Sequence, residues 1–543
     1  MPEERPPADP DPGSSWSWSR PEDAHQGPAA DAPPPRARAH AAPPVARHAL
    51  PRNEDFRRTV GFTVLGTVLP GAGLIAAGRR VVGSVVLAVF VLTLVALGLA
   101  ALVDRDALIS VGVDPTMLRR LSIVLVVVAA LWVVVVVATH LALRHRPTRP
   151  QRVVGGVLVG VLAFAVAAPM AVAARTAYVQ AGLVGTLFKS SGETKSATRP
   201  TMNSSHPGDQ EQQQDPWADK ARLNILLLGG DADKGRVGTR TDTVILASID
   251  TKSGDTSLFS LPRNLVGMPF PSDSPLRRYY PNGFTDGSGD NAEYFLNAMY
   301  RDVPARVPKD ILGETDNLGA DVLKLSVGQA LGLKVDYYAL INLQGFSKMV
   351  DALGGVRLNI NTYIPMGGNS DLKIPPKEYL HPGANQKLDG RETLWYARGR
   401  YGSDDFARMD RQRCVINAMI KQANPANVLT RYEDIANASK SIVYTDIPQE
   451  VLPAMVDLSL RVKKGNVRSI VFKDGVSGFR SVNPDFSLMR SRVKKALGEA
   501  KSDSTPPKTT GSKDTAKAPT SEDVDSTCRY DPKVAATAKP YTG

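Results

Sequence analysis

The apolar residues of this chain are concentrated between residues 59 and 175, where Leu, Val, Ala and Gly follow one another with few charges. Four apolar stretches stand out within this block, at 59–78, 81–103, 121–139 and 153–174. The last three contain no charged residue and are long enough for a helix to cross about 30 Å of hydrocarbon. The first contains five glycines and Pro70, which interrupt a helix. The pattern therefore predicts a transmembrane region over 53–175, with three crossings and a re-entrant or hairpin-like segment over 59–78.

The positions of the arginines indicate which loops face the cytoplasm. Residues 140–152 contain four arginines and no acidic residue, whereas residues 104–120 balance three arginines with three aspartates. Because cytoplasmic loops are enriched in Lys and Arg, we expect the N-terminus inside, with Arg79 and Arg80, and the C-terminal domain outside. Four full crossings with the domain in the cytosol remain the alternative. The spans hold no charged residue that would mark an ion path, so the region is interpreted as an anchor rather than a transporter.

The hydrophobic pattern after residue 222 indicates a soluble α/β domain. Continuous apolar runs predict buried strands at 224–228, 243–249 and 256–261, with a hairpin turn at 250–254. Further strands are predicted at 336–343, 356–360 and 467–472, and helices at 290–301, 318–331, 345–353, 404–423, 426–438, 448–463 and 484–498. Because strands and helices alternate, we expect a mixed sheet whose faces are covered by helices.

Composition completes the domain organisation, since the chain is too long for one compact core. Residues 1–52 are rich in Pro, Ala and Arg, with one Leu and no Ile, and are predicted to be a disordered cytoplasmic tail. Residues 176–221 are predicted to be an extracellular linker, and 499–543 a low-complexity tail. Juxtamembrane arginines explain the net charge of +12. Binding of nucleic acid is not expected, because no long Lys/Arg run or aromatic-interleaved basic patch occurs.

Two aspartates lie at the ends of the first two predicted strands. Asp231 follows the apolar run that ends in Gly229-Gly230, and Asp242 precedes the run at 243–249. Because a short loop joins these strands, the two carboxylates can meet. Such a pair can hold Mg²⁺, which takes its other oxygens from phosphate and water. The alternative is that each aspartate is a turn or cap residue, since Asp favours loops.

Arginines gather near the third strand and in the segment 395–422. Arg263 follows the strand, and the segment contains Arg398, Arg400, Arg408 and Arg411. We expect Arg398 and Arg400 to share a face of an extended segment, and Arg408 and Arg411 to point together from a helix. Guanidinium groups bind phosphate oxygens as planar forks and stay charged, so such a set suits a diphosphate. The alternative is a solvated helix face with ion pairs to Asp404, Asp405 and Asp410.

Six blocks between residues 222 and 424 resemble the LytR-CpsA-Psr family, in an actinobacterial type with a multi-span membrane region. In chain order they read NILLLGGD, RTDTVILASID, SLPRN, YYALINLQGFSKMVDALGGV, LDGRETLWYARGR and DDFARMDRQR. The resemblance implies a three-layer α/β/α sandwich as the catalytic domain over 222–424, followed by a helical extension over 425–498. It also implies Mg²⁺-dependent transfer of a glycopolymer from a polyprenyl-diphosphate-linked donor to peptidoglycan, beside the lipid bilayer.

The resemblance assigns roles to residues of this chain. Asp231 and Asp242 become the metal ligands, and with Arg263 and Arg408 they form the expected catalytic set. The implied diphosphate clamp consists of Arg240, Arg263, Arg398, Arg400 and Arg408, with Arg411 and Gln412 close by. Asn264 departs from the family, which usually has Asp there. A hydroxyl of peptidoglycan would attack phosphorus, and the group that takes its proton stays open.

Two other functions remain open at the same site. One is a non-catalytic scaffold or regulator that binds a lipid diphosphate, and the other is a diphosphatase that acts on the same donor.

The two cysteines are candidates for a disulfide. Cys414 lies in a predicted helix and Cys528 in the C-terminal tail. An exported domain permits a bond between them, which would fasten the tail across the domain. The alternative is that Cys414 is a buried apolar residue and Cys528 a free thiol.

Overall fold

The structure is a computed structural model of the chain and carries side chains. It describes residues 52–103, 111–144, 147–200, 217, 220–230, 239–369, 372–422, 443–499 and 522–541. Three predictions therefore lie outside the described residues: the role of Asp231, the helix at 426–438 and the N-terminal tail before Arg52.

Within the described residues, three helices are long and apolar enough to cross a membrane. They are α3 (Arg80–Val103), α5 (Pro115–Leu143) and α6 (Arg149–Leu187), and each contains one of the predicted spans. Their surfaces expose long runs of Val and Leu, as a surface in contact with lipid does. The helix α6 continues past residue 174 into the stretch that was predicted to be a linker.

The stretch 59–78 is broken as its glycines and proline predict. The helix α1 (Arg52–Val68) ends before Pro70, and the short helix α2 (Ala72–Ala76) begins after Gly71. Gly71 has a φ of +99°, and a Cβ at this position would overlap the carbonyl oxygen of Gly83. Only glycine fits both the backbone conformation and the close approach. That this segment enters the membrane without crossing it stays a prediction.

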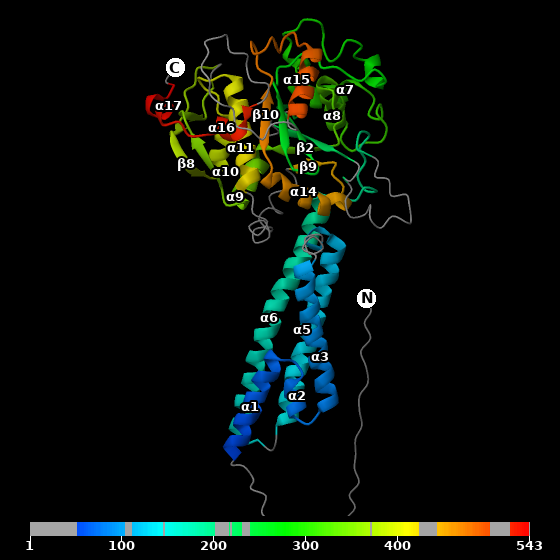
Figure 1. Ribbon diagram of the computed structural model, residues 1–543, viewed down its shortest axis with the longest axis vertical. Coiled ribbons are helices and arrows are strands. Elements are labelled where there is room, and N and C mark those ends of the chain that lie inside the picture. The colour runs from blue at the N-terminus through cyan, green and yellow to red at the C-terminus, as the bar shows by residue number, and fades with distance from the viewer. Residues whose placement is uncertain are drawn as a thin grey trace, which may run out of the picture. The chain divides into compact units, whose positions relative to one another are not determined.

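The soluble domain is built on one mixed sheet of seven strands (Figure 1). Its order is β11-β10-β3-β2-β1-β4-β9. The strands are β1 (Arg222–Gly230), β2 (Thr241–Asp250), β3 (Thr256–Leu261), β4 (Tyr337–Asn342), β9 (Val443–Thr445), β10 (Val467–Val471) and β11 (Glu522–Asp523). The pairs β1–β4 and β3–β10 are parallel, and the other neighbours are antiparallel.

From Ile225 to Leu228, strand β1 is continuously apolar because both of its faces are buried. Leu226 and Leu228 pack into the larger core, whereas Leu223, Ile225 and Leu227 face the smaller cores on the other side. Successive side chains of a strand point to opposite faces, so a strand between two helical layers shows no polar alternation. This is the physical basis of the continuous apolar run.

Helices cover both faces of the sheet, and the predicted three-layer α/β/α sandwich is confirmed. On one face lie α7 (Met299–Arg306), α8 (Leu318–Leu331) and α15 (Phe486–Glu499). On the other lie α11 (Asp405–Gln422), α14 (Leu452–Lys464) and α16 (Val524–Thr527), as Figure 1 shows for α7, α8, α11, α15 and α16. Single turns of 3₁₀ helix stand at η1 (Pro275–Arg278), η2 (Ala292–Tyr294), η3 (Leu296–Ala298) and η4 (Gln449–Val451). The helix expected at 290–301 is thus replaced by η2, η3 and the start of α7.

A smaller lobe with its own core stands beside the main sheet. It contains α9 (Leu343–Ala352), β5 (Val356–Ile360), β6 (Ile364–Met366), β7 (Glu378–Leu380), β8 (Gly383–Leu388) and α10 (Gly390–Arg398). The strand expected at 356–360 exists, but it pairs with β8 rather than with the central sheet. Conversely, β9 and β10 belong to the central sheet, so the predicted boundary at 424/425 cuts through the sandwich. Short-range patterns reveal strands but not their partners.

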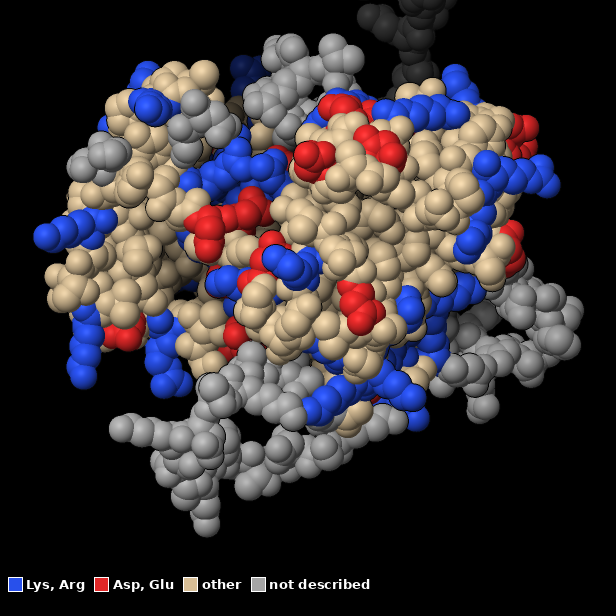
Figure 2. All heavy atoms as spheres, turned by 90° about the horizontal axis from the view of Figure 1, so that it is seen from above, with Lys and Arg blue, Asp and Glu red and all other residues tan. Residues whose placement is uncertain are grey.

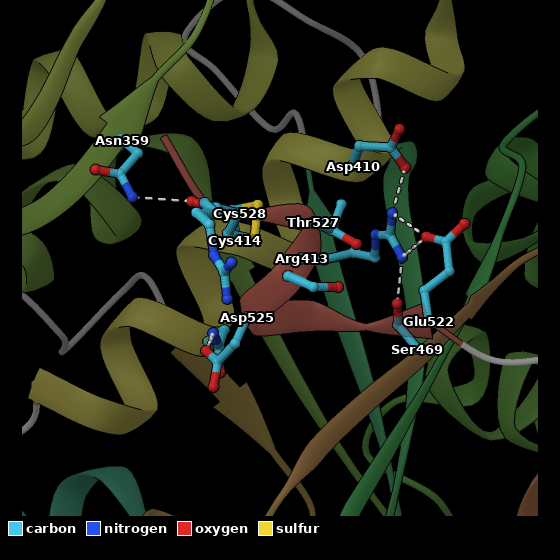
Figure 3. Close-up of a disulfide and its surroundings, with 12 residues drawn as sticks. Asn359, Asp410, Arg413, Cys414, Ser469, Glu522, Asp525, Thr527 and Cys528 are labelled. Carbon is cyan, nitrogen blue, oxygen red and sulfur yellow. Dashed lines mark hydrogen bonds and ion pairs between the residues drawn. A yellow bond between two sulfur atoms is a disulfide. The ribbon is translucent and has the colours of Figure 1, made fainter. Parts of the chain in front are cut away.

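The prediction of a low-complexity tail over 499–543 is wrong for residues 522–541. These residues form β11, α16 and α17 (Pro532–Thr537) and pack on the domain. Glu522 and Asp523 pair with β10, and a disulfide joins Cys528 to Cys414 on α11 (Figure 3). The polar composition of this segment suggested disorder. The segment is ordered because it is bound to β10 and α11, which composition does not reveal.

Removal of the disulfide should destabilise the domain. Replacing Cys414 by Ser opens a covalent loop with a sequence separation of 114 residues, and we expect a loss of about 2–4 kcal/mol in the free energy of unfolding. Thermal unfolding of the detergent-solubilised full chain measures the change. A reductant should bring the parent to the midpoint of the variant and leave the variant unchanged; equal shifts in both proteins would contradict the prediction.

Candidate functional site

The register between β2 and β3 places an acidic and a basic side chain next to each other. Val244 pairs with Leu261 in this antiparallel ladder, so Asp242 and Arg263 leave the sheet at the same end. Arg263 Nη1 donates to Asp242 Oδ1 at 3.1 Å, and Asn297 Nδ2 donates to the same oxygen at 3.0 Å. Among the described residues, both hydrogen bonds to the Asp242 side chain therefore end on Oδ1. At the neighbouring strand end, Gly230 pairs with Thr241.

The ionised form of Asp242 is favoured. Burial works against the charge, but Arg263, the Asn297 amide and Arg408 together outweigh it and hold the pKa of Asp242 below its ordinary value of 3.8. The carboxylate is thus an anion throughout the physiological pH range. It is suited to bind a cation and poorly suited to accept a proton at neutral pH.

Helix α11 brings a second ion pair, between Arg408 and Asp405, to the same end of the sheet. Arg408 is 5% exposed, and its Nη2 lies 2.9 Å from Asp405 Oδ1 and 3.3 Å from the carbonyl oxygen of Asp242. Asp405 Oδ1 is also 3.4 Å from Arg263 Nε. Arg263 consequently bridges the two carboxylates, one on β2 and one on α11. This chain of alternating charges ties the first turn of α11 to the end of the sheet.

Arg408 is surrounded by charges of both signs. Burial lowers the pKa of Arg408 from its ordinary value, Asp405 and Asp242 work against this shift, and the positive charges of Arg263 and Arg400 add to it. A guanidinium stays protonated despite such a change. Arg263, Arg400 and Arg408 are therefore close enough to repel one another, and the carboxylates of Asp242 and Asp405 offset this repulsion.

Arg411 and Gln412, the other two residues predicted on α11, bind neighbouring elements of the domain. Arg411 Nε donates to the carbonyl oxygen of Tyr396 at 2.7 Å, and its Nη2 donates to that of Gly399. A cation is favoured at these carbonyls because they end helix α10. Gln412 Nε2 donates to Thr243 Oγ1 at 2.9 Å. Arg411 lies close enough to Arg408 for their charges to interact, and its Nε and Nη2 fasten α10 to α11. That Arg411 points with Arg408 toward a ligand stays a prediction.

The expectation that Arg398 and Arg400 share a face of an extended segment is wrong. Arg398 is the last residue of α10, and its guanidinium lies 5.0 Å from the centre of the Trp395 ring. Arg400 is exposed in the loop between α10 and α11. Arg240, which precedes β2, forms an ion pair with Glu293. None of these three arginines is part of the bridge at Arg263, although the charge of Arg400 is close enough to act on Arg408.

A model of the LytR_cpsA_psr family matches residues 186–476, which is more than half of the chain. The chain belongs to the LytR_cpsA_psr family. The polyisoprenyl-teichoic acid–peptidoglycan teichoic acid transferase TagU of Oceanobacillus iheyensis is 27% identical over 260 residues, or 47% of this chain and 69% of that protein. Biofilm regulatory protein A of Streptococcus mutans is 26% identical over 315 residues, or 55% of this chain and 69% of that protein. The crystal structure of B. subtilis TagV is 24% identical, covers 52% of this chain and 97% of its own, and has a TM-score of 0.35.

Two residues of this LytR_cpsA_psr site were not predicted from the sequence. Asp405 entered only as an ion-pair partner of a helix arginine, although its position three residues before Arg408 was a usable signal. Asn297 gave no signal, because the short 3₁₀ turn η3 that brings it to Asp242 is placed only by the packing of the core. Asn264, the departure from the family pattern, donates to Ser481 Oγ at 3.3 Å.

Several polar atoms of the site are buried and lack a well-directed hydrogen bond. Among the described residues these include Asp405 Oδ1, Arg408 Nε and Asn297 Oδ1. Buried polar groups are rarely left in this state unless a ligand, ion or water completes them. Carboxylate oxygens of Asp242 and Asp405 fit Mg²⁺, which often uses one or two carboxylates and completes its shell with phosphate and water. The described residues contain no cluster of three or more metal-binding side chains.

The depressed pKa of Asp242 predicts a pH-dependent contribution to stability. A lowered folded pKa means that the stabilisation is present above the ordinary value of 3.8 and is lost as the pH falls through the folded pKa. The melting temperature of Asp242→Asn should therefore lie below that of the parent at neutral pH, and the gap should narrow in acid. The exposed Asp290→Asn variant serves as control. A gap that stays constant with pH would contradict the assignment.

Proposed function

We propose that this chain is a membrane-anchored phosphotransferase. It would move a glycopolymer from a polyprenyl-diphosphate-linked donor to peptidoglycan on the outer side of the membrane. The observation that carries the proposal is the bridge of Arg263 between Asp242 and Asp405, with Arg408 beside it. The surface supports it as well: Figure 2 shows Lys and Arg side chains gathered in a hollow together with Asp and Glu side chains.

The arginines suit the charge changes of phosphoryl transfer. The oxygen of the acceptor hydroxyl bonds to the phosphorus that carries the polymer, and the bond between that phosphorus and the bridging oxygen breaks. Polyprenyl phosphate leaves with the bridging oxygen, and the hydroxyl proton passes to water. The charge on the phosphate oxygens is the main obstacle, so positioned cationic donors supply most of the catalysis. Arg263 and Arg408 are placed to bind these oxygens, and Arg398, Arg400 and Arg240 to extend the clamp. Asp242 is assigned to cation binding and not to proton transfer.

Mg²⁺ is part of the proposal. Asp242, with Asp231 as the second predicted ligand, would hold the ion. The bound ion would neutralise oxygens of the diphosphate. Without a cation, Asp242 engages Arg263, so an ion on this carboxylate would leave the guanidinium to the phosphate.

The relatives support the substrate class. The name of the Oceanobacillus iheyensis protein gives it a polyisoprenyl-linked teichoic acid as donor and peptidoglycan as acceptor. Family membership and the arginine cluster make a polyprenyl-diphosphate-linked glycopolymer the corresponding proposal for this chain.

The proposed topology has the N-terminus inside and the domain outside. Three candidate spans and the arginine-rich residues 140–152 favour it. The disulfide between Cys414 and Cys528 supports it too, because such bonds persist outside the reducing cytoplasm. A membrane anchor then keeps the site beside a donor that is itself a lipid.

Replacement of Arg263 tests the activity. The full chain in detergent is incubated with Mg²⁺, a lipid-diphosphate-linked oligosaccharide and peptidoglycan, and products are identified by mass spectrometry. Arg263→Ala should lower the transfer rate by roughly 10²–10³-fold, as loss of one oxyanion-stabilising donor does. Arg391→Ala removes an exposed arginine that pairs with Glu378 and should leave the rate unchanged.

The products separate the alternative functions. Release of phosphorylated oligosaccharide without attachment to peptidoglycan would replace transfer by a diphosphatase activity. If the parent binds the donor without turnover, and Arg263→Ala binds it equally well and also without turnover, a non-catalytic scaffold is favoured.

Thiol labelling in intact cells tests the topology. In Cys414→Ser, Cys528 is the remaining cysteine, because the chain has two. We expect a membrane-impermeant maleimide to label it without lysis. A chain without either native cysteine but with Ser19→Cys should be labelled only after lysis. The reverse pattern would place the domain in the cytosol.

A further inference from the structure

The C-terminal segment 522–541 runs from the central sheet along helix α11. Its first residues extend the sheet, where Glu522 pairs with Ser469 of β10. The carboxylate of Glu522 lies 3.0 Å from Nη1 of Arg413, a fully buried residue of α11 (Figure 3). Three residues beyond Glu522, Asp525 Oδ1 accepts a hydrogen bond from Asn417 Nδ2 at 2.8 Å. The segment is thus fastened to the helix that carries Arg408.

Beyond the disulfide the segment crosses to the smaller lobe. Asn359 Nδ2 donates to the carbonyl oxygen of Cys528 at 3.0 Å, as Figure 3 shows, and Asn361 Nδ2 donates to that of Arg529 at 3.0 Å. The backbone N–H of Asp531 returns a bond to Asn361 Oδ1 at 2.9 Å. These bonds fasten residues 528–531 to the smaller lobe.

The segment reaches the loop between α10 and α11 at Tyr541. Its ring centre lies 5.6 Å from that of Tyr401, in an edge-to-face arrangement. The hydroxyl of Tyr379 donates to the carbonyl oxygen of Tyr541. A Cβ on Gly402 would overlap the ring of Tyr541, so the aromatic ring lies directly against the loop backbone.

The covered loop is a tight turn that carries Arg400. The N–H of Ser403 donates to the carbonyl oxygen of Arg400 at 2.9 Å, and Gly402 has a φ of +70°. Such a turn requires glycine at its third position. At its start, Arg411 holds the carbonyl of Gly399. The loop is therefore held by Arg411 on one side and by Tyr541 on the other.

We propose that Tyr541 is a positioning residue for the loop Gly399–Asp404, and through it for Arg400 in the diphosphate clamp. An exposed arginine on a free loop must be ordered when an anion binds, and that entropy cost weakens binding. The ring of Tyr541 holds the turn in place before the ligand arrives. The expected effect of Tyr541 on ligand binding rests on the proposed function, whereas its effect on the order of the loop does not.

Three variants of the full chain in detergent test the proposal. Tyr541→Ala removes the ring, Tyr541→Phe keeps it, and Val534→Ala truncates an exposed side chain of the same segment. The exposed fractions are 53% for Tyr541 and 43% for Val534, so all three should melt with the parent. Hydrogen–deuterium exchange of peptides over 399–404 should rise in Tyr541→Ala alone.

Binding of farnesyl diphosphate in the presence of Mg²⁺ is the second readout. Tyr541→Ala should weaken the affinity roughly three- to tenfold, the cost of ordering one or two side chains. Tyr541→Phe and Val534→Ala should bind as the parent does.

The two readouts fail in different ways. Unchanged loop exchange in Tyr541→Ala, or an equal rise in Val534→Ala, overturns the positioning role whatever the affinity is. A rise in loop exchange with unchanged affinity separates Arg400 from the clamp and also overturns the proposal. If the parent does not bind farnesyl diphosphate at all, the proposed function fails, while the exchange data still decide whether Tyr541 orders the loop.

Discussion

The antiparallel register of β2 and β3 is the constraint on which the candidate site depends. It places Asp242 and Arg263 at one end of the sheet, where a single hydrogen bond joins them. Because Arg263 also reaches Asp405, the position of α11 is tied to the same point. A shift of one residue in the register would turn the Asp242 side chain to the other face of the sheet and break the bridge. The site is therefore as rigid as the central strands.

The sequence predicted the central strands well, because their patterns are local. The runs at 243–249 and 256–261 lie within β2 and β3, and the helix at 318–331 coincides with α8. The resemblance to the family directed attention to Asp242, Arg263 and Arg408, which the structure brings together. The strands and the helix were predicted because burial leaves a strong signal in a short stretch, whereas the roles of Asp242, Arg263 and Arg408 stay predictions.

The failures share a cause as well, since they concern partners that are distant in the sequence. The strand at 356–360 pairs with β8 and not with the central sheet, and Asn297 reaches Asp242 from the single 3₁₀ turn η3. The bonds of Arg411 Nε and Nη2 to the carbonyls that end α10 were not predicted, and its assignment to the ligand stays a prediction. The segment 522–541 is polar enough to suggest disorder, and it is ordered by its bonds to α11 and β10.

Charge balance explains why such a site needs more than arginines. In the bridge, two carboxylates face two guanidiniums, so Arg263 and Arg408 are already compensated before any ligand arrives. A diphosphate must then compete with Asp242 and Asp405 for the same donors, and both carboxylates repel it. Under the proposed function, a divalent cation on Asp242 would reverse this balance, because it would cancel the repelling charge and leave Arg263 to the ligand. The low pKa of Asp242 fits that proposal, since protonation could not relieve the competition at neutral pH. Arg398 and Arg400, which lie outside the bridge, would then add the positive charge that the bridge itself lacks.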